Sequence, residues 1–199
     1  MTHVHRVARF FGALALIGGL TAMTACSSPP TEELAAAEAT VDSVKALDVV
    51  AQYGMAEVRD AEQSLARARQ QITSKDYDQA LQSINQAQRT ARGAVTAAQR
   101  SMEAAMQDAR RAIADATSAI AEANEAIPKA PRWGKGAIRD IAALRDDVAA
   151  AQADLTSAQG QYDRGMYREA SSTARSAITK ARAVTQTVSD AIELRESAR

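Results

Sequence analysis

The chain has 199 residues, of which 24 are Lys or Arg and 24 are Asp or Glu, so it carries no formal net charge. Such a balance offers no basic surface strong enough to predict binding to nucleic acid. The chain holds two histidines and a single cysteine, which leaves few side chains for metal-bound or nucleophilic chemistry. These numbers direct attention to the start of the chain and to its periodicity.

Residues 1–25 have the layout of a secretory signal peptide. Arg6 and Arg9 precede an uninterrupted apolar or glycine run from Phe10 to Leu20, and small residues follow this run. A membrane-spanning helix needs about 20 apolar residues, which is more than this run supplies. We therefore expect the segment to be removed, which leaves 22 basic residues (24 − 2) against 24 acidic ones in the mature chain.

The only cysteine follows the small residues of this leader, and the stretch Met23-Thr24-Ala25-Cys26 resembles the bacterial lipobox. The resemblance implies cleavage between Ala25 and Cys26, a diacylglycerol on the cysteine sulfur and an acyl chain on the new amino terminus. Ser27 in the next position implies, by the sorting rule of Gram-negative lipoproteins, the outer membrane with the protein facing the periplasm. The alternative is a free or intermolecularly bonded cysteine behind an ordinary signal-peptidase site.

The mature chain lacks the side chains of the commonest catalytic sites. His3 and His5 both lie in the leader, and an acylated Cys26 is no longer a thiol. These losses exclude Cys–His nucleophiles, Ser–His–Asp triads and the commonest zinc ligands, and the sequence shows no glycine-rich phosphate loop. We expect a protein that is not an enzyme, with no catalytic residue, no metal and no cofactor besides the covalent lipid.

From residue 32 onward, apolar residues recur every three or four positions, which predicts long amphipathic helices. Four such seams are Leu34, Ala37, Val41, Val44 and Leu47, continued by Val58, Ala61, Leu65, Ala68 and Ile72; Met102, Met106, Ala109, Ile113, Ala116, Ile120, Ala123 and Ile127; Ile141, Leu144, Val148, Ala151, Leu155, Ala158 and Tyr162; and Tyr167, Ala170, Ala174, Ala177, Ala181, Val184, Val188 and Ala191. The fold class is therefore all-α, with long antiparallel helical hairpins in an elongated bundle or coiled coil. The seams close either within one chain or against a second copy in a homo-oligomer.

Proline and glycine divide the helical part into two predicted hairpins. Residues 26–31 are the acylated cysteine and its tether, and residues 32–127 form the first hairpin. Residues 128–136 are a Pro/Gly linker, and residues 137–197 form the second hairpin. A Tyr53-Gly54 pair either kinks the first helix or breaks it in two.

The two hairpins are predicted to be copies of one another. Tyr77 and Tyr167 are separated by 90 residues (167 − 77), and the same offset pairs several seam positions. These pairs are Ala61/Ala151, Leu65/Leu155, Ala68/Ala158, Ala80/Ala170, Ala87/Ala177 and Ala91/Ala181. A tyrosine just after each turn is more specific than another alanine, so we interpret the pattern as a duplication.

Around each turn the hairpins resemble tetratricopeptide units, although the early Trp-Leu-Gly positions and the terminal proline of that repeat are missing. A closer resemblance is to uncharacterised alanine-rich bacterial lipoproteins with a domain of unknown function. It is carried by Ala61-Glu62, Leu65, Ala68, Asp76-Tyr77, Ala80-Leu81 and Ala87. The resemblance implies an anchored helical protein and no particular chemistry.

Trp133 is the only tryptophan, and Arg132 and Lys135 flank it within the linker. We expect it to pack the linker over the end of the bundle. The alternative is contact with a partner or a membrane surface, because Trp and basic side chains suit such an interface. Arg199 at the carboxyl end cannot form the lysine-type link to peptidoglycan that Braun-type lipoproteins use, so covalent cell-wall attachment is not supported.

Together these features predict a non-catalytic, lipid-anchored protein of the cell envelope. It would act as a structural tether or as an interaction module for another envelope protein. The alternative is a periplasmic chaperone-like module whose Ala/Met-rich groove, with Met102 and Met106, binds peptides.

Overall fold

The computed structural model describes residues 28–198. Within this range the chain forms six α-helices, one short 3-10 helix and no strand. The elements are α1 (Thr31–Lys45), α2 (Asp48–Tyr53), α3 (Met55–Thr73), α4 (Tyr77–Ala126), η1 (Ile127–Lys129), α5 (Ile141–Asp163) and α6 (Tyr167–Glu196). The predicted all-α class with long packed helices is confirmed.

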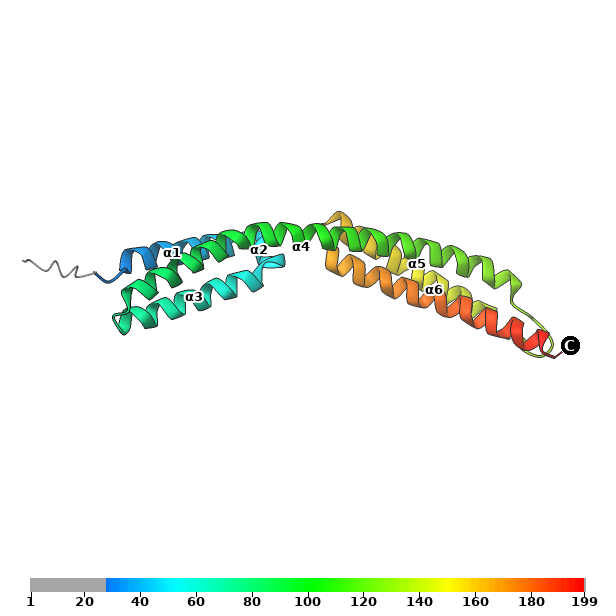
Figure 1. The fold of residues 1–199 in the computed structure, drawn as a ribbon. Helices are drawn as coiled ribbons and strands as arrows, with labels where there is room; N and C mark the ends of the chain where they lie inside the picture. The colour runs from blue at the N-terminus through cyan, green and yellow to red at the C-terminus, as the bar shows by residue number, and fades with distance from the viewer. Residues whose placement is uncertain (1–27, 199) are drawn as a thin grey trace, which may run out of the picture.

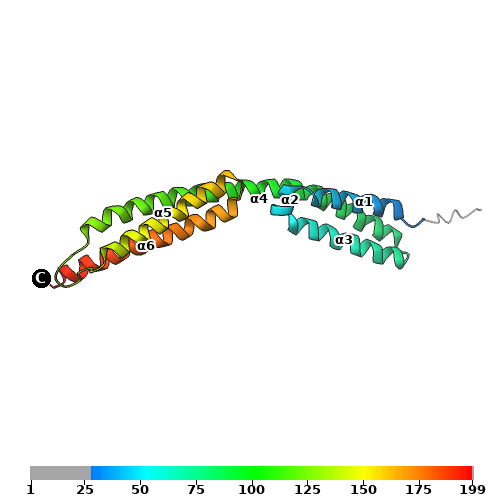
Figure 2. The ribbon, with the colours of Figure 1, turned by 180° about the vertical axis from the view of Figure 1, so that it is seen from behind.

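The helices form two three-helix bundles that lie end to end and share α4 (Figures 1 and 2). In the first bundle, α1 with α2 and the returning α3 pack against the amino-terminal part of α4. In the second, the carboxyl-terminal part of α4 packs against the returning α5 and against α6. Each bundle therefore runs up, down and up along one axis, and the whole is a rod.

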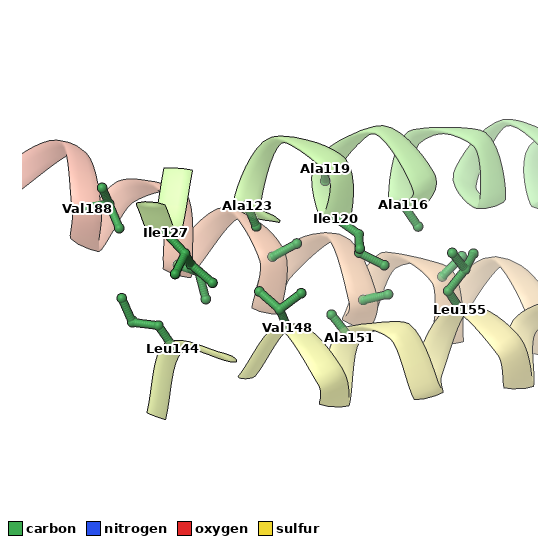
Figure 3. Packing of buried hydrophobic residues seen from close by; sticks show 14 of the residues in the cluster. Ala116, Ala119, Ile120, Ala123, Ile127, Leu144, Val148, Ala151, Leu155 and Val188 are labelled. Atoms are coloured by element: carbon green, nitrogen blue, oxygen red, sulfur yellow. The ribbon is translucent and has the colours of Figure 1, made fainter. Parts of the chain in front are cut away.

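The core of the rod consists largely of alanine. Along α4 the buried positions are Ala80, Ile84, Ala87, Ala91, Ala94, Ala98, Ala109, Ala112, Ala116, Ala119, Ile120 and Ala123. Valine, leucine and isoleucine from the neighbouring helices fill the space beside them, as Figure 3 shows for Leu144, Val148 and Leu155 of α5 facing Ala116, Ile120 and Ala123 of α4. Small side chains let the helix axes approach closely, and most seam positions are buried within the single chain. Met102 and Met106 are exceptions, since both are only partly buried.

The division between the two cores lies inside α4. One buried cluster extends from Ala37 to Ala98, and the other begins at Ala112 and extends to Val188. The sequence placed the boundary at residues 128–136, but that segment connects α4 to α5 inside the second bundle. No proline lies between Tyr77 and Pro128, so α4 continues without a break from the first bundle into the second. The apolar periodicity could not locate the boundary, because it does not show which helices cover the seam.

The first predicted helix is broken twice. Gly54 separates α2 from α3, which resolves the open alternative at Tyr53-Gly54 in favour of a break. A Cβ atom at Gly54 would lie 3.0 Å from the Ala98 Cβ atom, so glycine permits close contact with α4. A second break after Lys45 was not predicted, and it leaves Leu47, assigned to the seam, 43% exposed at the start of α2.

The predicted duplication is visible in the backbone of the two turns. α3 ends at Thr73 and α5 ends at Asp163, while α4 and α6 begin at Tyr77 and Tyr167, so both boundaries keep the offset of 90 (163 − 73; 167 − 77). Lys75 and Gly165 occupy the same position with φ values of +65° and +78°. Both turns have the Schellman pattern, in which the amides of Asp76 and Met166 bond to the carbonyls of Gln71 and Gln161.

Candidate interaction site at one end of the rod

The two ends of the rod differ in what they present. Residues 28–30 lead into α1 at the end where α3 turns into α4. The opposite end, here called the distal end, holds the α4–α5 connection and the carboxyl end of α6 (Figure 1). Trp133, Arg132 and Lys135, the candidate contact residues, lie in this connection. Ala25 and Cys26, the predicted cleavage and lipidation positions, lie outside the described residues.

Residues 131–138, which we call the Trp133 loop, form a closed and well-supported turn. The Ile138 amide donates to the Pro131 carbonyl at 2.8 Å, and the Ala137 amide donates to the Gly134 carbonyl at 3.2 Å. Gly136, with a φ of +80°, occupies the third position of this inner turn, where a positive φ favours glycine. Pro131 is fully buried at the base of the loop, so the loop is fixed to the bundle at that point.

Gly136 provides the second attachment of the Trp133 loop. A Cβ atom at this position would overlap the carbonyl oxygen of Ala191 and lie 3.1 Å from the Leu194 Cβ atom. The loop backbone therefore lies directly against the last turns of α6. Proline and glycine, rather than an aromatic side chain, hold the connection on the end of the bundle.

Trp133 does not pack over the end of the bundle as the sequence led us to expect. Its side chain is 77% exposed, the largest value among the exposed large hydrophobic residues of the described chain. Leu194, beside Gly136, is 50% exposed at the same end. The sequence could not reveal this, because composition alone does not distinguish a tryptophan that covers a bundle from one that projects from it.

Four basic residues lie within six positions of Trp133 along the chain. Lys129, Arg132, Lys135 and Arg139 are all exposed, and residues 128–139 contain no acidic residue. Within residues 28–198 none of the four forms an ion pair. Lys129 and Arg139 were not singled out from the sequence, although four cations in twelve residues were a signal that could have found them. Asp140 follows and accepts a hydrogen bond from the Ala143 amide at 2.9 Å as the cap of α5.

A second cluster lies where the bundles meet. No residue between Gln99 and Asp108 of α4, a segment we call the waist, is buried. Arg168 of α6 spans the gap: its guanidinium lies 4.6 Å from the centre of the Tyr53 ring, and its Nη1 atom donates to the Gln52 carbonyl at 3.1 Å. Burial raises the pKa of Tyr53, and the positive charge of Arg168 opposes this effect.

Beside the waist, α4 and α6 are joined by a polar group. The Ser171 hydroxyl donates to Asp108 Oδ2 at 2.5 Å, and Arg175 pairs with the same carboxylate at 2.9 Å. The hydrogen bond from Ser171 has the largest effect and lowers the pKa of Asp108. Desolvation, the next largest effect, raises this pKa, and the charges of Arg175 and Arg111 lower it, so that it lies below its usual range. With Arg168, Ser172 and Ala105 these residues line a surface hollow of about 280 Å³.

Neither cluster brings together side chains that could hold a metal ion. Among the described residues there is no group of three His, Cys, Asp or Glu side chains placed to hold a metal ion. The Asp108 carboxylate is already paired, and the arrangement around it serves to join two helices. At the distal end the arrangement can offer an apolar side chain and positive charge to a surface.

Comparisons with known proteins identify no relative: the chain matches no protein-family model, no curated protein and no solved structure. The class of protein is therefore defined by the fold and by the two ends of the rod alone. The described chain is an all-α rod of two three-helix bundles joined by a shared central helix. None of its helices is both long enough and apolar enough to cross a membrane.

Proposed function

We propose that this protein is a non-catalytic, lipid-anchored spacer of the cell envelope. In this proposal the leader is cleaved after Ala25, lipids on Cys26 hold the chain at the outer membrane, and the rod projects into the periplasm. The distal end is then the part of the molecule farthest from the anchor and the part that meets a partner.

The observation that carries the proposal is the position of the two ends. The described chain starts at one end of the rod, and the α4–α5 connection lies at the other (Figure 1). This connection contains the exposed Trp133. α4 alone contributes 50 residues, and at a rise of about 1.5 Å per residue it extends over about 75 Å. A long molecule with an anchor at one end and an exposed contact at the other is suited to keep two structures at a fixed distance.

The packing supports a spacer over a peptide-binding module. Most seam positions are buried against one another within the chain, and Met102 and Met106, which the groove was expected to use, lie partly buried in the short waist between the two cores. The exposed large hydrophobic residues of the described chain are Leu47, Trp133, Met166 and Leu194, which are scattered over different elements. Single exposed apolar residues of this kind do not form a continuous client-binding surface.

Substitution of the cysteine tests the anchor. We expect Cys26→Ser to release the protein from the membrane fraction into the soluble fraction, because the sulfur that carries the diacylglycerol is gone. Ser27→Ala is the matched control, and it should stay with the membranes. Unchanged membrane association of the Cys26→Ser protein, measured by fractionation and immunoblotting, would overturn the proposed anchor.

A further inference from the structure

We propose that the Trp133 loop binds the anionic phospholipid surface of a second membrane, opposite the one that holds the anchor. The inference deepens the proposed function, since it names the partner of the distal end. It rests on the proposed function in one respect only, which is that the rod points away from the membrane that holds the anchor.

The shape of the distal end favours insertion into a surface. Trp133 projects from a loop that is fixed by the buried Pro131, by the contact of Gly136 with α6 and by the Pro131–Ile138 hydrogen bond. The loop is therefore preorganised, and little conformational entropy is lost when it binds. Tryptophan favours the boundary between acyl chains and headgroups, because its ring is apolar and its indole N–H can remain hydrated.

The charge around Trp133 selects an anionic surface. Lys129, Arg132, Lys135 and Arg139, less Asp140, give residues 128–140 a net charge of +3 (4 − 1). The end of α6 adds Glu193, Arg195 and Glu196, a net charge of −1, and the last turns of α4 add Glu122 and Glu125, which line one surface hollow with Lys129. These residues together are neutral (3 − 1 − 2), so the positive charge is confined to the connection that holds Trp133. The mature chain as a whole is predicted to be slightly negative, so the positive charge is local to the part that carries Trp133.

A membrane fits this end better than a folded protein partner does. Stable protein interfaces bury about 800 Å² on each partner and are usually built around a pocket or a broad flat patch. The distal end offers one fully projecting ring, the half-exposed Leu194 and a set of separated cations on the narrow end of a three-helix bundle. One inserted indole ring and a few separated cations can bind a fluid, anionic surface, which does not need to match the shape of the protein.

The length of the rod makes this surface a second membrane. α4 is continuous through both bundles, so the Trp133 loop is held about 75 Å or more from the end where the described chain begins. A rod that projects from the anchoring membrane, as in the proposed function, therefore holds the Trp133 loop away from that bilayer. The anchored protein would bridge two membranes.

The first test uses the mature chain from residue 26 with Cys26→Ser, which carries no lipid. Both buried clusters lie between Ala37 and Val188, so this chain retains the whole fold. Trp133 is the only tryptophan and reports its own environment. With phosphatidylglycerol vesicles, we expect the Trp133 fluorescence to shift to the blue and to be quenched when the lipids carry brominated acyl chains. With phosphatidylcholine vesicles, the fluorescence should stay unchanged.

Charge and ring variants make the test specific. Arg132→Gln with Lys135→Gln should weaken binding to phosphatidylglycerol vesicles roughly 25-fold at low salt, about fivefold for each charge removed. The matched control, Arg92→Gln with Arg100→Gln, removes two exposed cations from α4 in the first bundle and should bind normally. Trp133→Ala should weaken co-sedimentation at least about tenfold, while Trp133→Phe keeps most of the binding.

The second test asks whether the contact is on another membrane. The acylated protein in one set of vesicles should cluster added phosphatidylglycerol vesicles, measured by light scattering, and the Arg132/Lys135 variant should not. Three results would overturn the inference: no fluorescence change with anionic vesicles, equal weakening by the two charge pairs, or no clustering by the acylated protein. Photocrosslinking from position 133 in the native envelope that yields a protein instead of lipid also overturns it. The fluorescence and charge-pair measurements use a chain without lipid, so their outcomes are independent of the proposed anchor at Cys26.

Discussion

Glycine and proline decide how the one exposed aromatic residue of the rod is presented. Pro131 is buried and Gly136 lies against the Ala191 carbonyl, so the connection is held by its backbone and the side chain of Trp133 remains free. Gly134 has nearly the same backbone conformation as Gly136, with φ values of +82° and +80°, but an added Cβ atom would meet nothing within 4 Å. Gly134→Ala would therefore introduce conformational strain alone, whereas Gly136→Ala would introduce both strain and a steric overlap with α6.

This difference predicts unequal effects of alanine. Gly134→Ala should cost about 1–2 kcal/mol, because an alanine must adopt a left-handed conformation. Gly136→Ala should cost about 1–3 kcal/mol more, because the methyl group also displaces the loop from α6. Amide hydrogen exchange of Ile138, whose N–H bonds to Pro131, is the measurement. Equal exchange rates in the two variants would contradict the attachment of the loop through Gly136.

At the scale of elements, α4 is the feature that organises the molecule. Its first half completes one core and its second half begins the next, with the waist between them. The long seams and the two turns were predictable, because burial of an apolar stripe and the Schellman geometry are both local in sequence. The break after Lys45 and the division inside α4 were not, because both depend on which helix covers a given turn.

The Asp108–Ser171 contact between α4 and α6 predicts a pH dependence. The folded protein holds the pKa of Asp108 below the ordinary value, so the ionised carboxylate stabilises the α4–α6 pair above about pH 4. This stabilisation is lost as the pH falls through the lowered pKa. We expect Ser171→Ala to raise the pKa of Asp108 toward about 3.9, as measured by carboxyl-carbon NMR titration.

Two further variants check the origin of this effect. Ser172→Ala changes a neighbouring exposed serine that makes no bond to Asp108, and it should leave the titration of Asp108 where it is in the unmodified protein. Asp108→Asn should remove part of the acid sensitivity of the second bundle, read from amide exchange in α6. If Ser171→Ala and Ser172→Ala shift the pKa equally, the hydrogen bond is not its cause.

At the scale of the whole molecule, the stiffness of the rod depends on α4 and on the side chain of Arg168. Apart from the shared α4, no helix of the first bundle packs beside α5 or α6 in the described chain. Arg168 connects the bundles through the Tyr53 ring and the Gln52 carbonyl. These contacts join the bundles at the waist, where no residue of α4 is buried, so we expect them to oppose bending.

Removal of this side chain should loosen the waist. An exposed cation–π contact contributes about 0.5–1 kcal/mol and a hydrogen bond about 1 kcal/mol, so Arg168→Ala should raise the population of bent forms about 10- to 30-fold. Spin labels on cysteines introduced at Asp60 and Arg182 in the Cys26→Ser protein should show a broader distance distribution. Tyr53→Phe keeps the ring and Arg145→Ala changes a distant exposed arginine, and both should leave the distribution narrow. A distribution that Arg168→Ala leaves unchanged would show that α4 alone sets the stiffness.

The amino-acid sequence by itself determined the helices, their seams and the two matching turns, because apolar periodicity and turn backbone geometry are encoded within a few neighbouring residues. It also carries the Cys26 motif on which the proposed anchor rests. The tertiary structure decided that α4 is shared by two cores, that Arg168 reaches Tyr53 across the waist and that Trp133 projects at the distal end. These features depend on contacts between residues far apart in the chain, and no local pattern specifies which side of a helix or loop another segment will cover.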